Sequence, residues 1–379
     1  MSDNRLVSLD AFRGFTIASM VLVNNPGDWG HLYRQLGHAE WHGWTFTDWV
    51  FPFFLFIVGV AMTFSLARRQ GQVQERWPLV LSLWRRAAII IGIGLMLNLI
   101  PNFDFATVRI PGVLQRIGLC IVVAAPIVVY AGWRAQGAWI VVCFAVYSVL
   151  MLAVPVPGPD GVVAAGALEP GRDAGAYIDR LLLSGHLWAR SKTWDPEGLV
   201  CTLPAVATLL FGVLTGHGLA AKMDAAAKTV WMLLAGLLCL WIGAMLDAVF
   251  MPINKSLWTP SYAIFMTGWA LVVFAAFYWL MDAVEDDAIR ARSRAWLQPM
   301  TIYGMNALFI FAFSGLVAKM MAFIKVGEPA QSLKALAYAP IKALPLAPVN
   351  ASLVFAILFN LAMFAVAWFM WKKKWFVKV

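Results

Sequence analysis

Long apolar stretches recur along nearly the whole chain, and polar segments separate them. About ten of these stretches approach the ~20 residues that a helix needs to cross a bilayer. Because lipid offers the backbone no hydrogen-bond partners, such stretches fold as helices. The pattern predicts an all-α polytopic membrane protein, a bundle of about ten transmembrane helices with an internal cavity. The expected spans are 8–25, 46–67, 84–100, 114–131, 138–154, 200–218, 229–250, 260–281, 299–320 and 351–371.

The composition agrees with a membrane protein. Hydrophobic residues make up 61% of the chain and charged residues 13%, against about 25% charged residues in soluble domains. The net charge of +9 comes from basic clusters in alternate connections, which the positive-inside rule assigns to the cytoplasm. We therefore expect both termini in the cytoplasm, contact with membrane lipid and no nucleic-acid partner. The clusters are Arg68–Arg69, Arg85–Arg86, Lys222 with Lys228, Arg290 with Arg292 and Arg294, and Lys372–Lys374.

The connection 155–199 is long and begins with a turn-rich stretch of Pro and Gly. Connections of this length in a compact protein are usually functional or disordered. We expect it to lie outside the membrane as a lid over an outward-facing site. At the other end of the chain, the polar residues 1–9 predict no cleavable signal peptide.

The connection after the first span holds three of the five histidines, His31, His38 and His42. A neutral imidazole takes a proton from an amine or a hydroxyl near physiological pH, so this connection is the first candidate for acid–base chemistry. His38 and His42 have a spacing that would suit two metal ligands on one helix face. A zinc site needs a third ligand, which the sequence does not offer nearby, so we expect no metal.

Asp48 follows His38 by ten residues and opens the second span. In the stretch 45–48 it resembles the acid of a capping box that begins a helix. It also suits an orienting carboxylate that fixes the tautomer of His38, as in a catalytic triad. The spacing leaves both interpretations open.

Several other polar residues allow a structural and a functional interpretation. Asn24 ends the first span, either as a helix C-terminal residue or as an amide donor to an oxyanion. Arg116 either extends toward the membrane surface or directs its guanidinium into the site. Asp10 and Arg13 are three residues apart on one helix face, which suits an ion pair or an arginine that faces a cavity.

The motifs that contain these residues resemble a known family, the transmembrane acetyltransferases typified by heparan-α-glucosaminide N-acetyltransferase and their short bacterial relatives. The matching motifs follow one another along nearly the whole chain. They are Ser8-Leu9-Asp10-Ala11-Phe12-Arg13-Gly14, Val23-Asn24, His38-Ala39-x-Trp41-x-Gly43, Asp48-x-Val50-Phe51-Pro52-x-Phe54-x-Phe56, Gly112-Val113-Leu114-Gln115-Arg116, Asp195-Pro196-Glu197-Gly198 and Asn254-Lys255-Ser256-Leu257-Trp258-Thr259.

The resemblance implies an acetyl-CoA-dependent N-acetylation in a bacterial inner membrane, with the donor from the cytoplasm and the amino sugar on the other side. It assigns the family's active-site histidine to His38 and its asparagine to Asn24, and it favours the catalytic interpretation of Asp48. His42 stands where the family often has Asn, so substrate contacts there differ. The motifs begin almost at Met1, so we expect glucosamine or an amino-sugar end of the cell envelope rather than heparan sulphate.

Residues 1–379 then form a single transmembrane acyltransferase domain, and a homodimer is possible. The alternative is an amino-sugar permease for glucosamine or N-acetylglucosamine, with His38 and Asp48 as a proton relay. The expected catalytic residues are His38, Asn24 and Asp48; the expected substrate-binding residues are Trp41, His42, Gln115, Arg116, Glu197, Lys255 and Trp258; and the expected acetyl-CoA contacts are Arg13, Arg68, Arg69, Arg85 and Arg86.

Overall fold

The computed structural model describes residues 6–70 and 75–377, without the side chains of residues 68–70. Two short hairpins, β1 (Val156–Pro157) with β2 (Val163–Ala164) and β3 (Lys325–Val326) with β4 (Gln331–Ser332), interrupt an otherwise helical chain. The helices are α1 (Val7–Asn24), α2 (Val50–Gln70), α3 (Trp77–Leu99), α4 (Val113–Tyr130), α5 (Trp133–Ala153), α6 (Ala174–Leu183), α7 (Thr202–Ala220), α8 (Ala225–Val249), α9 (Pro260–Tyr278), α10 (Asp287–Trp296), α11 (Gln298–Met305), α12 (Ala307–Phe323), α13 (Leu333–Lys342) and α14 (Pro348–Lys372).

The predicted fold class, an all-α polytopic membrane protein, is confirmed. Within residues 6–70 and 75–377, nine helices are long and apolar enough to cross a membrane, and a bent pair would make ten. The expected span 299–320 coincides with this bent pair, α11 and α12, which meet at an angle of 81°.

Asn306 lies at this break and is 1% exposed. Its side-chain amide donates to the Trp375 carbonyl at 3.0 Å and accepts from the Val377 N–H at 3.0 Å. The segment after α14 therefore supplies partners for a polar side chain where the helix is interrupted. Hydropathy alone does not reveal such a break, because both halves are apolar.

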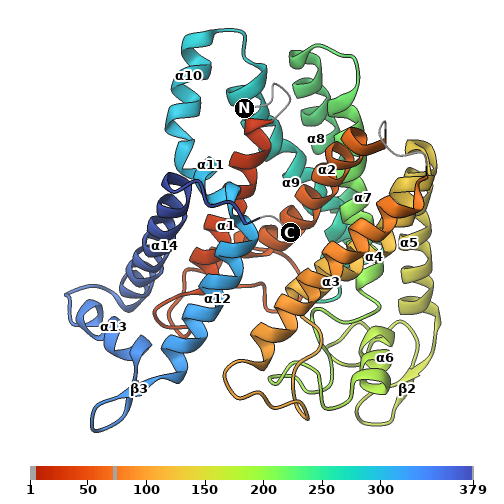
Figure 1. Cartoon of the computed structure of the whole chain (residues 1–379). Coiled ribbons are helices and arrows are strands. Elements are labelled where there is room, and N and C mark those ends of the chain that lie inside the picture. Colours follow the sequence, from red (N-terminus) through yellow and green to blue (C-terminus); the bar gives the residue numbers. More distant parts are fainter. Residues whose placement is uncertain (1–5, 71–74, 378–379) are drawn as a thin grey trace.

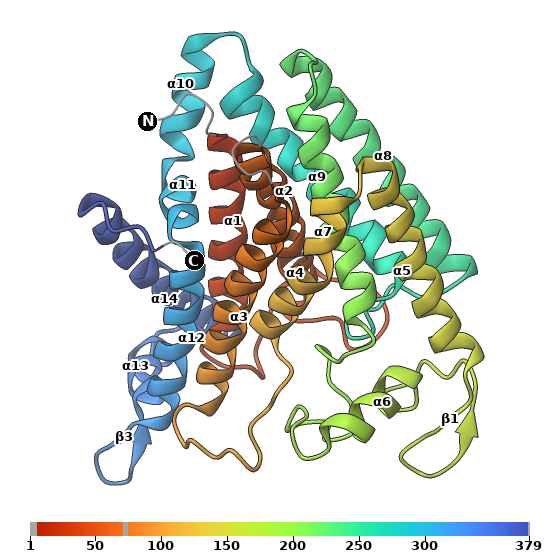
Figure 2. The same cartoon turned by 45° about the vertical axis from the view of Figure 1, so that its right-hand side comes forward.

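The bundle has two ends that differ in structure. The connections 25–49, 100–112, 154–201, 250–259 and 324–347 lie at one end, which we call the loop face, and α10 and the start of α1 lie at the other, which we call the opposite face. In Figures 1 and 2, α6 and α13 lie near the lower edge and α10 near the upper edge.

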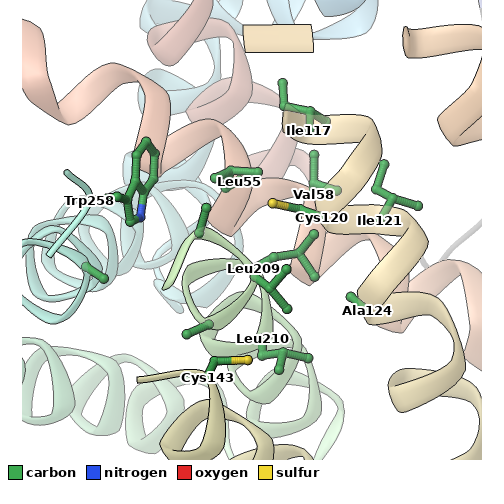
Figure 3. Packing of buried hydrophobic residues seen from close by; sticks show 14 of the residues in the cluster. Leu55, Val58, Ile117, Cys120, Ile121, Ala124, Cys143, Leu209, Leu210 and Trp258 are labelled. Carbon is green, nitrogen blue, oxygen red and sulfur yellow. The ribbon is translucent and has the colours of Figure 1, made fainter. Parts of the chain in front are cut away.

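Glycines allow the central helices to approach closely. A Cβ on Gly59 of α2 would lie 2.0 Å from the Leu209 carbonyl oxygen of α7, and one on Gly212 would lie 2.0 Å from that of Phe56. Small residues permit this packing, which is typical of membrane helices. Around this contact, Leu55, Cys120, Leu210 and neighbouring side chains from α2, α4, α5 and α7 form the main apolar core (Figure 3).

The long connection 154–201 is an ordered layer on the loop face and contains β1, β2 and α6 (Figure 2). The Asp173 carboxylate caps α6 by accepting from the Ala176 N–H at 2.8 Å. Arg180 donates to the carbonyls of Gly171, Thr193 and Pro157, which joins three turns of the segment. The segment therefore has internal order as well as contacts with the bundle.

Candidate active site

Asp48 is held rigidly where the connection 25–49 enters α2, within a 3₁₀ turn (Phe46–Trp49). Its Oδ2 accepts from the backbone N–H groups of Thr45 at 3.0 Å and Ala39 at 3.1 Å. The Tyr262 hydroxyl of α9 donates to the Asp48 carbonyl at 2.7 Å. Asp48 thus does begin the helical segment as a capping acid, and one carboxylate oxygen remains for a second role.

That second oxygen faces His38. The Nδ1 of His38 lies 2.6 Å from Asp48 Oδ1, and the side chains are 48% and 0% exposed, respectively. Because an ionised carboxylate only accepts, the short contact assigns the proton to Nδ1 and leaves Nε2 as the basic nitrogen. A buried carboxylate behind an accessible imidazole is the arrangement that orients a general base.

His38 and Asp48 both line a cavity of about 120 Å³ at the loop-face end of the bundle. Asn24 at the end of α1 and Lys255 from the connection 250–259 line the same cavity. An imidazole, a carboxylate, an amide and an ammonium group therefore share one chamber. The rest of its wall is largely apolar and includes Met20, Val23, Val50, Phe51, Phe54, Val113, Leu114, Ile117 and Phe311.

Lys255 belongs to a network of charges behind the cavity. Its Nζ lies 3.8 Å from Glu197 Oε1. Arg109 binds Glu197 at 2.5 Å and Asp195 at 2.5 and 2.8 Å. Burial would raise the pKa of Glu197, but the charges of Lys255, Arg109 and Arg116 outweigh it and lower that pKa to about 2. Glu197 is therefore ionised at neutral pH, and its charge holds Lys255 beside the cavity.

Arg116, Gln115 and Trp258 do not line the cavity. Arg116 is 1% exposed, and its guanidinium lies 5.9 Å from the ring centre of Phe51 and 5.2 Å from that of Trp258. Trp258 is fully buried and donates its Nε1–H to Thr208 at 3.1 Å. Gln115 is also buried. Arg116 and Trp258 therefore lie behind the wall and pack against Phe51. The assignment of all three residues to the substrate remains a prediction.

Trp41 and His42 join the connection 25–49 to other parts of the loop face. Trp41 donates its Nε1–H to the Leu168 carbonyl at 2.9 Å and packs edge-on against Trp194 at 5.1 Å. His42 Nδ1 lies 3.4 Å from the amide nitrogen of Asn254. Neither residue is part of the cavity wall, so their assignment to the substrate remains a prediction.

The arginines expected at acetyl-CoA lie far from the His38 pair along the helices. Arg13 pairs with Asp10 at 3.1 Å on α1, as the ion-pair interpretation of the sequence expected. Arg85 is exposed and Arg86 half-buried near the start of α3. None of these three lines the cavity of His38. The side chains of Arg68 and Arg69 lie outside the described residues, so their assignment stays a prediction.

The sequence analysis did not identify Arg109 or Asp179 as important. Arg109 is the centre of the network that holds Glu197, but it precedes the matched motif 112–116 and belongs to none of the motifs. Asp179 is a buried carboxyl on α6 that accepts from the Leu199 N–H at 2.9 Å. Burial raises the pKa of Asp179 to about 7 against the opposing effect of that hydrogen bond. The sequence around Asp179 did not indicate that its carboxyl group would be buried.

Comparison with known proteins establishes the family of this chain. A family model described as "Heparan-alpha-glucosaminide N-acetyltransferase, catalytic" matches residues 5–243. The chain belongs to this family. The resemblance inferred from the motifs is thereby confirmed. The family match includes Asn24, His38, Asp48 and Glu197 and ends before Lys255.

Two relatives named heparan-alpha-glucosaminide N-acetyltransferase are similar to this family member. The Homo sapiens protein is 28% identical in an alignment of length 359 that covers 81% of this chain and 52% of the relative. The Mus musculus protein is 27% identical in an alignment of length 362 that covers 82% of this chain and 53% of the relative. The chain thus spans about half the length of the curated relatives it matches.

Proposed function

We propose that this protein transfers an acetyl group from acetyl-CoA to the amine of glucosamine or a related amino sugar at the loop face. The observation that carries the proposal is the hydrogen bond of 2.6 Å between His38 and a buried Asp48 in the wall of a cavity. Membership of an N-acetyltransferase family supports the same reaction. We place the loop face outside the cytoplasm of a bacterial inner membrane, following the distribution of basic clusters.

His38 acts as the general base in this proposal. Acetyl-CoA supplies an activated acetyl carbonyl, and the sugar supplies a nucleophilic nitrogen. Nε2 of His38 takes the proton that the attacking amine loses and returns it to the departing sulfur. Asp48 keeps the other ring nitrogen protonated and stabilises the positive ring that forms between these two transfers.

Asn24 and Lys255 stabilise the negative charge that develops on the carbonyl oxygen. An amide N–H and an ammonium group both donate hydrogen bonds, and such donors act strongly in a site that excludes water. Removal of one donor of this kind typically slows a reaction ~10²–10³-fold. The proposed base and the proposed oxyanion donors come from different parts of the chain, α1, the connection 25–49 and the connection 250–259.

The cavity suits the reacting groups and not a whole coenzyme. Its volume is about 120 Å³, below the ~300–1,000 Å³ of a site that encloses a complete small ligand. Its apolar wall suits the end of a pantetheine arm. We propose that Arg13, Arg68, Arg69, Arg85 and Arg86 contact the phosphates, because phosphate groups bind arginine by charge-assisted hydrogen bonds. For acetyl-CoA to reach the cavity from the opposite face, the helices around Met20 and Phe311 would have to separate.

The test is glucosamine-dependent release of free CoA thiol from acetyl-CoA by the purified full chain. We expect His38→Ala to abolish this release, because the base is lost, while thermal stability stays near wild type. His31→Ala is the matched control, since His31 also pairs with a carboxylate, Asp28, on the same connection, but Asp28 is 39% exposed and His31 does not line the cavity of His38. Normal turnover in His38→Ala would end the proposal.

An amino-sugar permease remains the second candidate. The observation that favours it is the helix break between α11 and α12, because interrupted membrane helices are common at transporter binding sites. A permease would move labelled glucosamine into proteoliposomes without releasing thiol from acetyl-CoA. The thiol assay and the uptake assay on one preparation therefore separate the two functions.

A further inference from the structure

A second cavity, of about 230 Å³, lies on the other side of Asn24. Asn24, Asn25 and Trp29 form one part of its wall, and residues of α12, α13 and α14 form the remainder. Asn24 also lines the cavity of His38, so its amide stands where the two chambers meet. Its side chain is exposed and makes no hydrogen bond within the described residues. A ligand in the second cavity would therefore lie next to the proposed reaction centre.

The second cavity is cationic. Lys319 of α12 and Lys334 of α13 both contribute to its wall. Lys319 donates to the carbonyls of Leu97 and Ile100 at the end of α3. An ammonium group has three donors, so one donor of Lys319 remains for a ligand. Lys319 therefore has a structural role in joining α12 to α3 and still adds positive charge to the chamber.

Lys334 has no comparable structural explanation. It makes no hydrogen bond and no ion pair within 4 Å among the residues that the structure describes. Its Nζ lies 6.0 Å from the ring centre of Phe355, and the side chain is half-buried. Burial lowers the pKa of Lys334, although Asp28 opposes this effect. A half-buried ammonium group with no hydrogen bond or ion pair from the described residues carries an energetic cost, and an anion in the cavity would reduce that cost.

We propose that the second cavity binds an anionic group, a carboxylate or a phosphate, carried by the acceptor saccharide. The inference rests on the proposed function, because the amine of the same saccharide must reach the cavity of His38. Lys334 is then a specificity-determining residue that favours acidic amino sugars over neutral ones. Trp29, which is 51% exposed, offers a flat apolar surface at this wall against which a sugar ring packs.

An anionic lipid headgroup has the same chemistry as the proposed ligand, but the geometry favours the saccharide. The cavity shares Asn24 with the reaction chamber, and a lipid phosphate there would obstruct the acceptor. Asn25 and Trp29 add polar and aromatic contacts that suit a sugar. The experiment below separates the two sources.

The experiment compares glucosamine with glucosamine 6-phosphate as acceptors for the full chain in phosphatidylcholine nanodiscs. We expect the phosphorylated sugar to have a kcat/KM about 10-fold higher, since a charge-assisted hydrogen bond contributes roughly this factor. Lys334→Met should remove the preference, so that the two sugars have similar kcat/KM values, and Lys334→Arg should restore part of it. The matched control is Lys325→Met, a change of the same charge on the exposed strand β3.

Direct binding of glucosamine 6-phosphate, measured by calorimetry, separates failure of this inference from failure of the proposed function. Binding that depends on Lys334 without any acetylation would retain the anion site and reject the enzyme. Acetylation with equal kcat/KM for both sugars, unaffected by Lys334→Met, would reject the anion site and retain the enzyme. Thermal stabilisation by phosphatidylglycerol that Lys334→Met abolishes, without sugar binding, would assign the cavity to lipid and overturn the inference.

Discussion

The two ends of the bundle hold their charges in different ways. On the loop face, ion pairs join distant parts of the chain, as in Arg109 with Asp195 and Lys255 with Glu197. On the opposite face, Arg13 pairs with Asp10 and Arg290 with Asp287, each three residues away, and Arg294 pairs with Asp282, twelve residues away. Local pairs follow from sequence spacing and contribute little when exposed. Long-range buried pairs need the whole fold, and they surround the proposed site.

The largest effect should come from the carboxylate nearest to the cavity. In Asp48→Asn, the remaining side-chain oxygen accepts from the N–H groups of Ala39 and Thr45, as Oδ2 does in the wild type. The new NH₂ group therefore faces His38. Nδ1 must then accept, and the proton moves to Nε2, which is the wrong tautomer for a base. We expect the rate of acetyl transfer to fall ~10²–10⁴-fold with folding preserved, measured by thiol release and thermal unfolding.

Asp104→Asn, a change of the same type on the exposed connection 100–112, is the control for Asp48→Asn. If Asp48→Asn unfolds the protein, the capping role of the carboxylate dominates. If it folds and turns over at the wild-type rate, His38 does not depend on this carboxylate.

A smaller effect, mainly on stability, is expected from Glu197→Gln. The substitution keeps the shape of the side chain, but Lys255 loses its anionic partner and Arg109 keeps only Asp195. This loss should lower the free energy of unfolding by about 1–3 kcal/mol. The pKa of Glu197 lies below its ordinary value of 4.5, at about 2. Its stabilising contribution is therefore full above pH 4.5 and is lost as the pH falls through about 2.

Melting temperatures of the wild type and Glu197→Gln between pH 2 and pH 7 measure this contribution. The two curves should converge toward low pH, where the wild-type carboxyl becomes neutral. Glu169→Gln, on an exposed position of the same segment, should follow the wild type throughout. A constant gap between the curves at every pH would show that packing, and not charge, accounts for the role of Glu197.

The smallest effect on stability is expected on the opposite face, from Arg85→Ala. Arg85 is exposed, so the melting temperature should stay within about 1 °C, since surface substitutions typically change stability little. If Arg85 contacts a phosphate of acetyl-CoA, KM for acetyl-CoA should rise about 10-fold, because a charge-assisted hydrogen bond is lost. Arg292→Ala, an exposed change on α10, is the control, and an unchanged KM would leave membrane orientation as the reason for the cluster.

The sequence predicted the order and approximate positions of the helices where each span is a single apolar stretch, although α3 begins at Trp77 and not at the expected residue 84. It also brought His38 and Asp48 into consideration, because ten residues separate them in one polar connection. It predicted one span over 299–320 and gave no sign of the break at Asn306, whose side-chain amide hydrogen-bonds with residues 375 and 377. Hydrophobicity predicts the environment that a segment prefers, but it does not identify the residues that hydrogen-bond to one buried amide.

By itself, the sequence determined the membrane class, the order of the helices and the motifs that place the chain in its family. These properties follow from local composition and spacing, which each segment carries alone. Only the tertiary structure decided which polar residues face a cavity. Arg116 and Trp258 lie behind the wall of the His38 cavity, whereas Lys255 lies in that wall. Lys334 and Asn24 share the wall of the second cavity. Which way a side chain points depends on the packing of helices that are distant in the sequence.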